Sequence, residues 1–291
     1  MTILFVLIGN MVVSAQPVVA EGAEPEIVTE GYQFTEGPLW HPDGYLLFSD
    51  IPANTIYRWI PGEGAEVFVK PSDNSNGLAL DVSGNIVMVQ HAGKLSRLTY
   101  NGNTMETVVD SYNGMRLNSP NDLAVHSNGT IFFTDPPFGV SEEEKELDFN
   151  GVYMLKPDGT LTVFYKEFSH PNGVVLSPDE QKLYVNNSSS GEIVVFDINN
   201  SGKPVNPRSF ASVGERNNEG AADGMKVDAD GRVYSTGPGG VYVFDSEGNQ
   251  IQKIETESRI TNLAWGEAGN STLFMTAPSA VYRLEMAVSG R

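Results

Sequence analysis

Six polar residues recur at the heads of similar short segments, and all six carry oxygen atoms in their side chains. Each head opens a short apolar run that ends in a turn, as in Asn172-Gly-Val-Val-Leu-Ser-Pro-Asp. The heads, spaced by 40, 45, 51, 51 and 39 residues, are Glu36, Asn76, Asn121, Asn172, Asp223 and Asn262. Two carboxylates and four carboxamides, with no Lys or Arg among them, are donors that suit a hard divalent cation. The alternative interpretation is that these residues only begin strands and cap turns.

The elements that would position these heads are short strands. Three further apolar runs follow each head except the last, bounded by Gly, Asp, Asn and Pro, and the repeat has the length of a four-stranded propeller blade. The sixth repeat ends near Glu285 without a fourth strand, and Glu26–Thr29 lies where that strand is needed. We therefore predict an all-β, six-bladed β-propeller over residues 24–287, closed by an N-terminal strand that completes the last blade. The first strand of each blade lines the channel, so the heads should form a ring near one mouth.

One insertion interrupts the repeats. Residues 136–150 fall between the second and third strands of the third blade and contain Glu-Glu-Glu-Lys-Glu. A solvated loop is the simpler interpretation. The functional one is a rim segment that covers one mouth of the channel and contacts substrate.

Composition narrows the function classes. The 291 residues include no cysteine, which excludes disulfides, thiol catalysis and cysteine-ligated zinc. A net charge of −19 argues against nucleic acid and anionic membrane surfaces as partners. Four scattered histidines indicate that any metal is held by oxygen. We expect a small-molecule partner and a monomer or simple homo-oligomer.

The N-terminus has the features of an export signal. The apolar run at residues 3–13 is too short to span a bilayer, and small residues at Ala15 and Ala20 offer cleavage sites. We therefore interpret residues 1–20 as a signal peptide and expect a secreted or periplasmic protein, although no Lys or Arg precedes the run. An uncleaved interfacial segment or a truncated start are the alternatives.

In order and spacing, the motifs of the chain resemble those of the senescence marker protein (regucalcin)/gluconolactonase family, and its bacterial gluconolactonase-like branch in particular. The motifs are Glu36-Gly-Pro-Leu-Trp, Asn76-Gly-Leu-Ala-Leu-Asp, Ser119-Pro-Asn-Asp, Phe133-Thr-Asp-Pro-Pro-Phe-Gly, His170-Pro-Asn-Gly-Val and Ala222-Asp-Gly-Met. The resemblance implies a propeller enzyme that hydrolyses sugar lactones with a divalent metal, usually Ca²⁺; Mg²⁺, Mn²⁺ and Zn²⁺ are alternatives.

Site residues follow from the resemblance, position by position. It implies metal ligands at Glu36, Asn172 and Asp223, with Asn121 as a fourth ligand or a substrate contact. The metal would polarise the lactone carbonyl while Asp223 assists the attack of water.

Further residues are candidates at lower specificity. Asp122 is a second candidate for the base and a substrate contact. Arg116 and His91 are candidate substrate contacts, with a surface arginine and a turn histidine as the alternatives. Asp135 could serve a second metal site or cap a turn.

Other functions remain compatible with this sequence. The same metal site could hydrolyse other esters or organophosphates. A propeller could also be a non-catalytic binding module, but a scaffold has no need for converging carboxylates.

Overall fold

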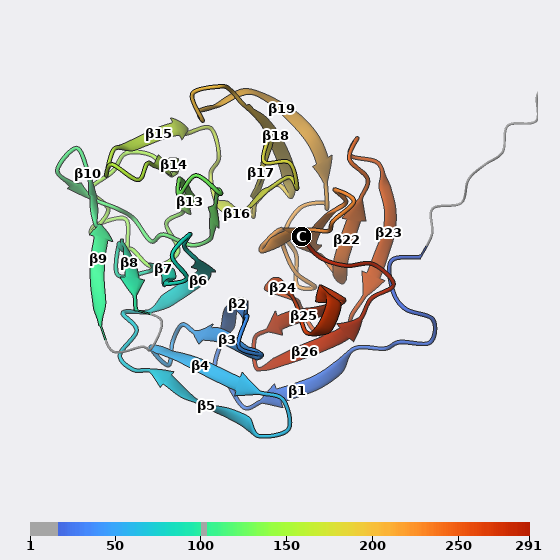
Figure 1. Ribbon diagram of the computed structural model, residues 1–291. Helices are drawn as coiled ribbons and strands as arrows, with labels where there is room; N and C mark the ends of the chain where they lie inside the picture. Colours follow the sequence, from blue (N-terminus) through green and yellow to red (C-terminus); the bar gives the residue numbers. More distant parts are fainter. Residues whose placement is uncertain (1–16, 100–103) are drawn as a thin grey trace, which may run out of the picture.

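A computed structural model describes residues 17–99 and 104–291, which form six four-stranded antiparallel sheets around a central axis (Figure 1). Each sheet is one blade, and its strands follow one another from the axis outward. This confirms the predicted all-β, six-bladed propeller. The one helical element among the described residues is the 3₁₀ turn Ala268–Asn270, labelled η1.

The first three blades use consecutive strands. Blade 1 comprises β2 (Thr35–His41), β3 (Tyr45–Asp50), β4 (Thr55–Ile60) and β5 (Gly64–Val69). Blade 2 comprises β6 (Ser75–Leu80), β7 (Ile86–Gln90), β8 (Lys94–Leu98) and β9 (Met105–Val109). Blade 3 comprises β12 (Leu123–Val125), β13 (Ile131–Asp135), β14 (Gly151–Leu155) and β15 (Leu161–Tyr165). Between blades 2 and 3 lies a small hairpin that we did not predict, β10 (Ser111–Tyr112) and β11 (Met115–Arg116).

The last three blades repeat the pattern. Blade 4 comprises β16 (Pro171–Leu176), β17 (Lys182–Asn187), β18 (Glu192–Ile198) and β19 (Pro204–Ser212). Blade 5 comprises β20 (Met225–Val227), β21 (Val233–Gly237), β22 (Gly240–Phe244) and β23 (Gln250–Glu255). Blade 6 comprises β24 (Asn262–Gly266), β25 (Thr272–Ala277), β26 (Ala280–Glu285) and β1 (Glu26–Glu30).

The ring closes as the sequence predicts. The N-terminal strand β1 pairs antiparallel with β26, so that the two ends of the propeller share one sheet (Figure 1). Pairing of Ile27 with Tyr282 and of Glu30 with Ala280 fixes the register. Closure leaves no open blade at the seam, where an unpaired edge could associate with another chain.

The core lies between neighbouring blades rather than at the axis. All six residues of β3 are buried, because one face packs on blade 6 and the other on blade 2. Two tryptophan side chains lie between blades: Trp40 stacks on Phe274 at 5.2 Å, and Trp265 meets Tyr234 edge-on. Strands covered on both faces read as continuous apolar runs, which is why the strand pattern is visible in the sequence.

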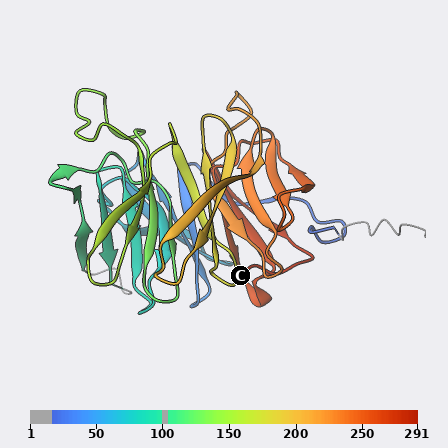
Figure 2. The same ribbon diagram turned by 90° about the horizontal axis from the view of Figure 1, so that it is seen from above.

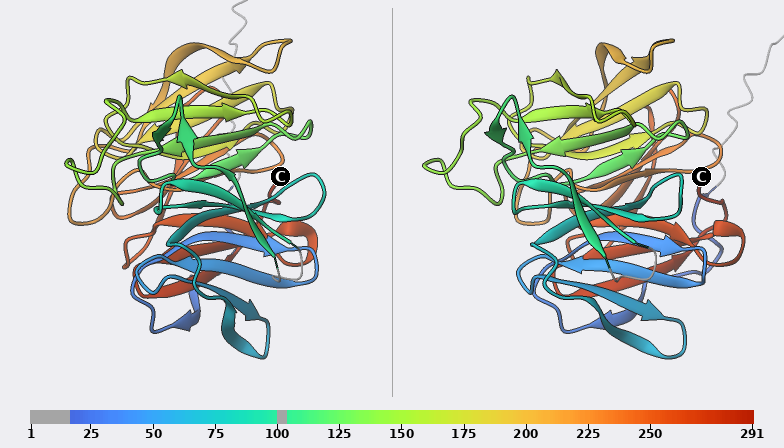
Figure 3. Two further views of the ribbon diagram at one scale, coloured as in Figure 1. Left: turned by 90° about the vertical axis from the view of Figure 1, so that its left-hand side faces the viewer. Right: turned by 60° about the vertical axis from the view of Figure 1, so that its left-hand side comes forward.

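The two faces of the disc differ. Segment 136–150 projects from one face, and the C-terminus lies at the other, near the axis (Figures 2 and 3). The C-terminal tail reaches blades 5 and 4: the backbone of Gly290 forms a bridge with Asp228, and Arg291 pairs with Glu180. No helix in residues 17–99 or 104–291 is long and apolar enough to cross a membrane.

Most of the predicted signal peptide, residues 1–16 of 1–20, lies outside the described residues. Residues 18–20 lie against blades 5 and 6. Val18 is fully buried, its amide donates to Gln252 Oε1 at 3.1 Å, and its carbonyl accepts from Ala287 at 2.8 Å. Residues 18–20 therefore belong to the folded domain in this structure.

Candidate functional site

The predicted ring of heads is present and forms the floor of a cavity of about 250 Å³. All six heads are buried. Five of them line the cavity: Glu36, Asn76, Asn121, Asn172 and Asp223. The sixth, Asn262, is not among the lining residues; its amide donates to Glu36 Oε2 at 2.9 Å.

Local backbone irregularity turns the heads toward the channel. The pairing of first and second strands shifts register between Glu36 and Leu39, between Ser75 and Leu78, and between Pro171 and Val174. In blades 3 and 5 the head comes before the first strand begins. The five heads that line the cavity therefore lie where regular pairing is interrupted or has not begun, whereas Asn262 pairs in regular register with Thr276. A bulge re-aims a side chain.

Four heads are followed by Gly because the next blade lies too close to leave room for a side chain. A Cβ added to Gly37 would lie 1.9 Å from the carbonyl oxygen of Asn76, and one added to Gly173 would lie 2.2 Å from that of Asp223. Gly77 and Gly224 are similarly close to Asn121 and Asn262. Each of these glycines thus lets one blade approach the head of the next blade, and only a residue without a side chain fits there.

Polar side chains of the second strands hold the heads from behind. Ser49 donates to the carbonyl of Asn76 at 2.8 Å, and Thr134 donates to that of Asn172 at 2.7 Å. Asn186 donates to the carbonyl of Asp223, also at 2.7 Å. Each donor belongs to the blade before the head that it holds, so the inner ring is fixed by contacts between blades.

Glu36 and Asp223 form a buried, interacting carboxyl pair. Burial, followed by repulsion from Asp223, raises the pKa of Glu36 well above its usual value. Burial also raises the pKa of Asp223 to about 6, and the Arg259 guanidinium opposes this rise. Arg259 Nη2 lies 3.1 Å from Asp223 Oδ2. Two carboxyl groups so placed resist ionising together unless a cation compensates them.

The carboxamides leave free acceptors beside this pair. Among the described residues, Asn172 Oδ1 and Asn76 Oδ1 are buried without a hydrogen-bond partner. Unpartnered buried oxygens are costly, and a hard cation would satisfy them. The donor set therefore fits a divalent cation held by Glu36, Asn172 and Asp223. In the part of the chain that the structure describes, no three His, Asp or Glu side chains cluster, so the site would rely on carboxamides as well.

His91 lines the cavity as a neutral donor or acceptor. Its Nε2 lies 3.1 Å from Asn76 Nδ2, which can only donate, so Nε2 accepts and Nδ1 carries the proton. Burial lowers the pKa of His91 to about 4. The residue is therefore uncharged at neutral pH and suits a sugar hydroxyl better than an anion.

Two other predicted contacts lie outside this cavity. Asp122 is buried but does not line it; Oδ1 accepts from the amide of Leu123, and Oδ2 has no partner among the described residues. The Arg116 guanidinium donates to the carbonyls of Leu117, Asn118 and His91. Arg116 lines a neighbouring hollow instead. That Asp122 and Arg116 contact the substrate stays a prediction. Their positions outside the cavity favour a role in holding the residues that line it.

Sequence reasoning missed several residues that line the cavity. Arg259 comes from the connection before blade 6, and Arg216 from the one before blade 5. Phe34, Pro52 and Phe138 form an apolar part of the wall. Phe138 belongs to segment 136–150, which therefore does contribute to the mouth. None of these residues occupies a recurring position, but all lie in connections at the channel mouth, and that is the signal that could have found them.

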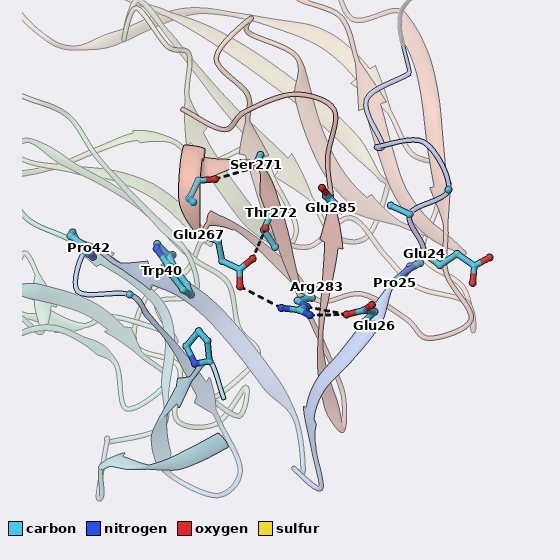
Figure 4. Close-up of a pocket in the computed structure, with 15 residues that line it drawn as sticks. Glu24, Pro25, Glu26, Trp40, Pro42, Glu267, Ser271, Thr272, Arg283 and Glu285 are labelled. Atoms are coloured by element: carbon cyan, nitrogen blue, oxygen red, sulfur yellow. Dashed lines mark hydrogen bonds and ion pairs between the residues drawn. The ribbon is translucent and has the colours of Figure 1, made fainter. Parts of the chain in front are cut away.

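A larger hollow of about 1150 Å³ lies at the outside, between blades 6 and 1 (Figure 4). Its arginine is paired: Arg283 contacts Glu26 at 2.9 Å and Glu267 at 3.6 Å, and Glu267 accepts from Thr272. None of its described lining residues has an unpartnered buried polar atom. The hollow thus lacks the unsatisfied donor set of the channel.

Comparisons with known proteins agree with this geometry. Over 293 aligned residues the chain is 36% identical to the gluconolactonase of Zymomonas mobilis, covering 91% of this chain and 82% of the relative. A gluconolactonase structure from Xanthomonas campestris superimposes with a TM-score of 0.83 at 32% identity, covering 93% of this chain and 94% of that one. A calcium-binding regucalcin from Agrobacterium tumefaciens shares the fold, with a TM-score of 0.78 at 19% identity, covering 92% and 96%. Residues 34–279 match the SMP-30/gluconolactonase/LRE-like region, and the chain belongs to that family.

Proposed function

We propose that the protein is a gluconolactonase-like hydrolase that opens sugar lactones with the help of a divalent cation. The observation that carries the proposal is the buried Glu36–Asp223 pair, with Asn172 Oδ1 unpartnered beside it, on the floor of a cavity. Kinship with a gluconolactonase at 36% identity supports the reaction class.

The cation would be held by Glu36, Asn172 and Asp223, with Asn121 as a further ligand or as a contact to substrate. When bound, a divalent cation supplies Lewis-acid polarisation of the lactone carbonyl. Oxygen ligands of this kind suit Ca²⁺ first, and Mg²⁺, Mn²⁺ or Zn²⁺ as alternatives.

Asp223 is the proposed general base. Its raised pKa of about 6 makes it a stronger base than an ordinary carboxylate, while it remains ionised at neutral pH. It takes a proton from the water whose oxygen adds to the carbonyl carbon. The ring C–O bond then breaks, and the ring oxygen receives a proton, so that one water and one lactone give one hydroxy acid.

The remaining walls orient the substrate. His91 and Asn121 present polar groups to ring hydroxyls, and Phe34 and Phe138 present apolar surface to C–H faces. A pocket of this mixed character fixes orientation with a few polar contacts.

The decisive experiment is a panel of aldonolactones and simple esters, assayed with each of the four cations and with chelator. We expect lactone hydrolysis that chelation abolishes and Ca²⁺ restores. No activity with any cation, and none lost on chelation, would favour a binding module instead.

The base assignment is tested by Asp223→Asn, which should lower kcat at least about 100-fold. Near-full turnover of that variant with metal bound, measured by calorimetry, would remove Asp223 from this role. Asp197→Asn, on strand β18 and half-buried far from the channel heads in its blade, is the matched control.

Export remains a proposal of its own, supported by the apolar run at residues 3–13. Cleavage after Ala15 would retain Val18 in the fold, whereas cleavage after Ala20 would remove it. Mass spectrometry of the protein recovered from the periplasm or medium tests both export and the site of cleavage.

A further inference from the structure

A second hollow adjoins the catalytic cavity. This hollow, of about 610 Å³, is lined by Ser189, Glu215, Arg216, Asn217, Asn218 and Arg259. Arg216 and Arg259 also line the catalytic cavity, so the two spaces adjoin at these side chains, and we call them together the groove. A substrate held at the ring of heads could therefore extend into this hollow, which we call the arginine end of the groove.

The opposite side of the mouth differs in its charged groups. A hollow of about 600 Å³ there shares Ile51 and His91 with the catalytic cavity. Its arginine, Arg116, is occupied by three backbone carbonyls, and the carboxylate of Glu144 lies in its lining. Among the described residues that line the two hollows, an unpaired positive side chain therefore lies on one side only.

Arg216 is the free group at the arginine end. It is exposed, and its guanidinium makes no hydrogen bond or ion pair with any side chain or carbonyl of the described residues. Glu215 is the single carboxylate among the residues that line this hollow, against two arginines. Arg259 is paired with Asp223 at 3.1 Å, so in a chain of net charge −19 the guanidinium of Arg216 supplies the unpaired positive charge of this hollow. Screening limits the repulsion from distant carboxylates to about 8 Å in physiological salt.

We propose that the arginine end binds an anionic substituent, a phosphate or a carboxylate, on a sugar lactone whose carbonyl lies at the ring of heads. Guanidinium groups bind both anions through paired N–H donors. The three uncharged polar side chains, Ser189, Asn217 and Asn218, add neutral hydrogen-bonding groups. The inference rests on the proposed lactonase function and adds the class of lactone that the site prefers.

The test compares three open-chain acids by titration calorimetry, with and without Ca²⁺. Gluconate has one carboxylate, glucarate has a second at the far end, and phosphogluconate has a terminal phosphate. We expect glucarate or phosphogluconate to bind about tenfold more tightly than gluconate, as one charge-assisted contact allows. Arg216→Gln should abolish that preference, and Arg216→Lys should retain part of it. Arg208→Gln, an exposed arginine of strand β19 paired with Asp197, should behave as wild type.

Equal binding of all three acids to the wild type would overturn the proposal. A preference that survives in Arg216→Gln would overturn it too, as would an equal weakening of gluconate, because Arg216 would then hold the common carboxylate. A lactonase assay with neutral and anionic lactones separates this proposal from the function on which it rests. Turnover of both with no preference contradicts only the anion site. Anion binding through Arg216 without any lactone turnover contradicts only the lactonase function.

Discussion

Arg259 donates a hydrogen bond of 3.1 Å to Asp223, and so a positive side chain already contacts a carboxylate that we assign to a cation. The guanidinium also lies over the ring of Phe34, with 5.7 Å between the guanidinium carbon and the ring centroid. Two effects oppose each other here. Arg259 keeps the pKa of Asp223 from rising further, which favours cation binding, but it also repels the cation and occupies a lone pair that the cation needs.

The repulsion should win above neutral pH. Unit charges 4 Å apart near a protein surface interact by about 4 kcal/mol, whereas reprotonation of Asp223 costs little at pH 8. We therefore expect Arg259→Gln to bind Ca²⁺ about tenfold more tightly than wild type at pH 8, as measured by calorimetry. The gain should shrink toward pH 6, where protons compete for Asp223.

The same substitution should lower the melting temperature of the metal-free protein, because Asp223 loses its partner. Arg259→Lys keeps the charge and serves as the control, with an affinity near that of wild type. Weaker Ca²⁺ binding by Arg259→Gln at pH 8 would show instead that Arg259 positions Asp223 for the metal.

The contacts between glycines and heads predict that a Gly-to-Ala substitution there lowers the free energy of unfolding by an unusually large amount. Gly37→Ala places a Cβ 1.9 Å from the carbonyl of Asn76, so blades 1 and 2 must separate. Gly37 also has φ of +53°, and Gly62, with φ of +80° and no atom within 4 Å of its Cβ position, isolates that backbone effect. In urea denaturation we expect Gly62→Ala to cost about 1 kcal/mol and Gly37→Ala about 3 kcal/mol or more. Equal costs would mean that the ring tolerates wider spacing.

Asp135 should make stability depend on pH. Burial raises its pKa from 3.8 to about 7, so the folded protein holds a proton there that the unfolded chain releases. The resulting stabilisation is complete below pH 4 and is lost as pH rises through 7. It should fall by about 3 kcal/mol between pH 5 and pH 8. Asp135→Asn should remove this contribution, so the difference in unfolding free energy between wild type and variant changes by that amount. A constant difference across this range would contradict the assignment.

Val18 should contribute to stability although it precedes the first strand. Its side chain packs in the core cluster shared by blades 5 and 6. In protein that retains residues 16–20, Val18→Ala should cost about 2 kcal/mol in urea denaturation. Val82→Ala is the matched control, because Val82 is 64% exposed and should change stability by less than about 0.5 kcal/mol. An equal effect of the two substitutions would place Val18 outside the folded core.

The fold could be predicted because propeller strands recur with one pattern. Buried second strands such as β7 and β13 begin with at least three consecutive apolar residues, and the heads reappear at blade length. Closure by Glu26–Glu30 followed from counting strands. The hairpin Ser111–Arg116 could not be predicted in this way, because it occurs in one repeat only.

The candidate site could be predicted where its residues recur from blade to blade, and not elsewhere. Recurrence located the five heads that line the cavity, since the first strand of every blade leads to the channel. It could not locate Arg216 or Arg259, because no other repeat has an arginine at the matching distance before its head. Nor could it show that Arg116 is occupied by carbonyl groups, which depends on how the hairpin folds back toward His91.

The tight contact of each glycine with the next head has a consequence for how this chain varies in length. The inner ring allows no change in spacing, so extra residues must lie elsewhere. The three longest repeats, of 45, 51 and 51 residues, contain Ser111–Arg116, segment 136–150 and the connection 213–222. These segments supply Phe138 and Arg216 to the groove and Arg116 to the hollow beside it. The repeats that are longer than the shortest one, of 39 residues, therefore contain the segments that line the mouth of the channel, and this can be read from the sequence alone.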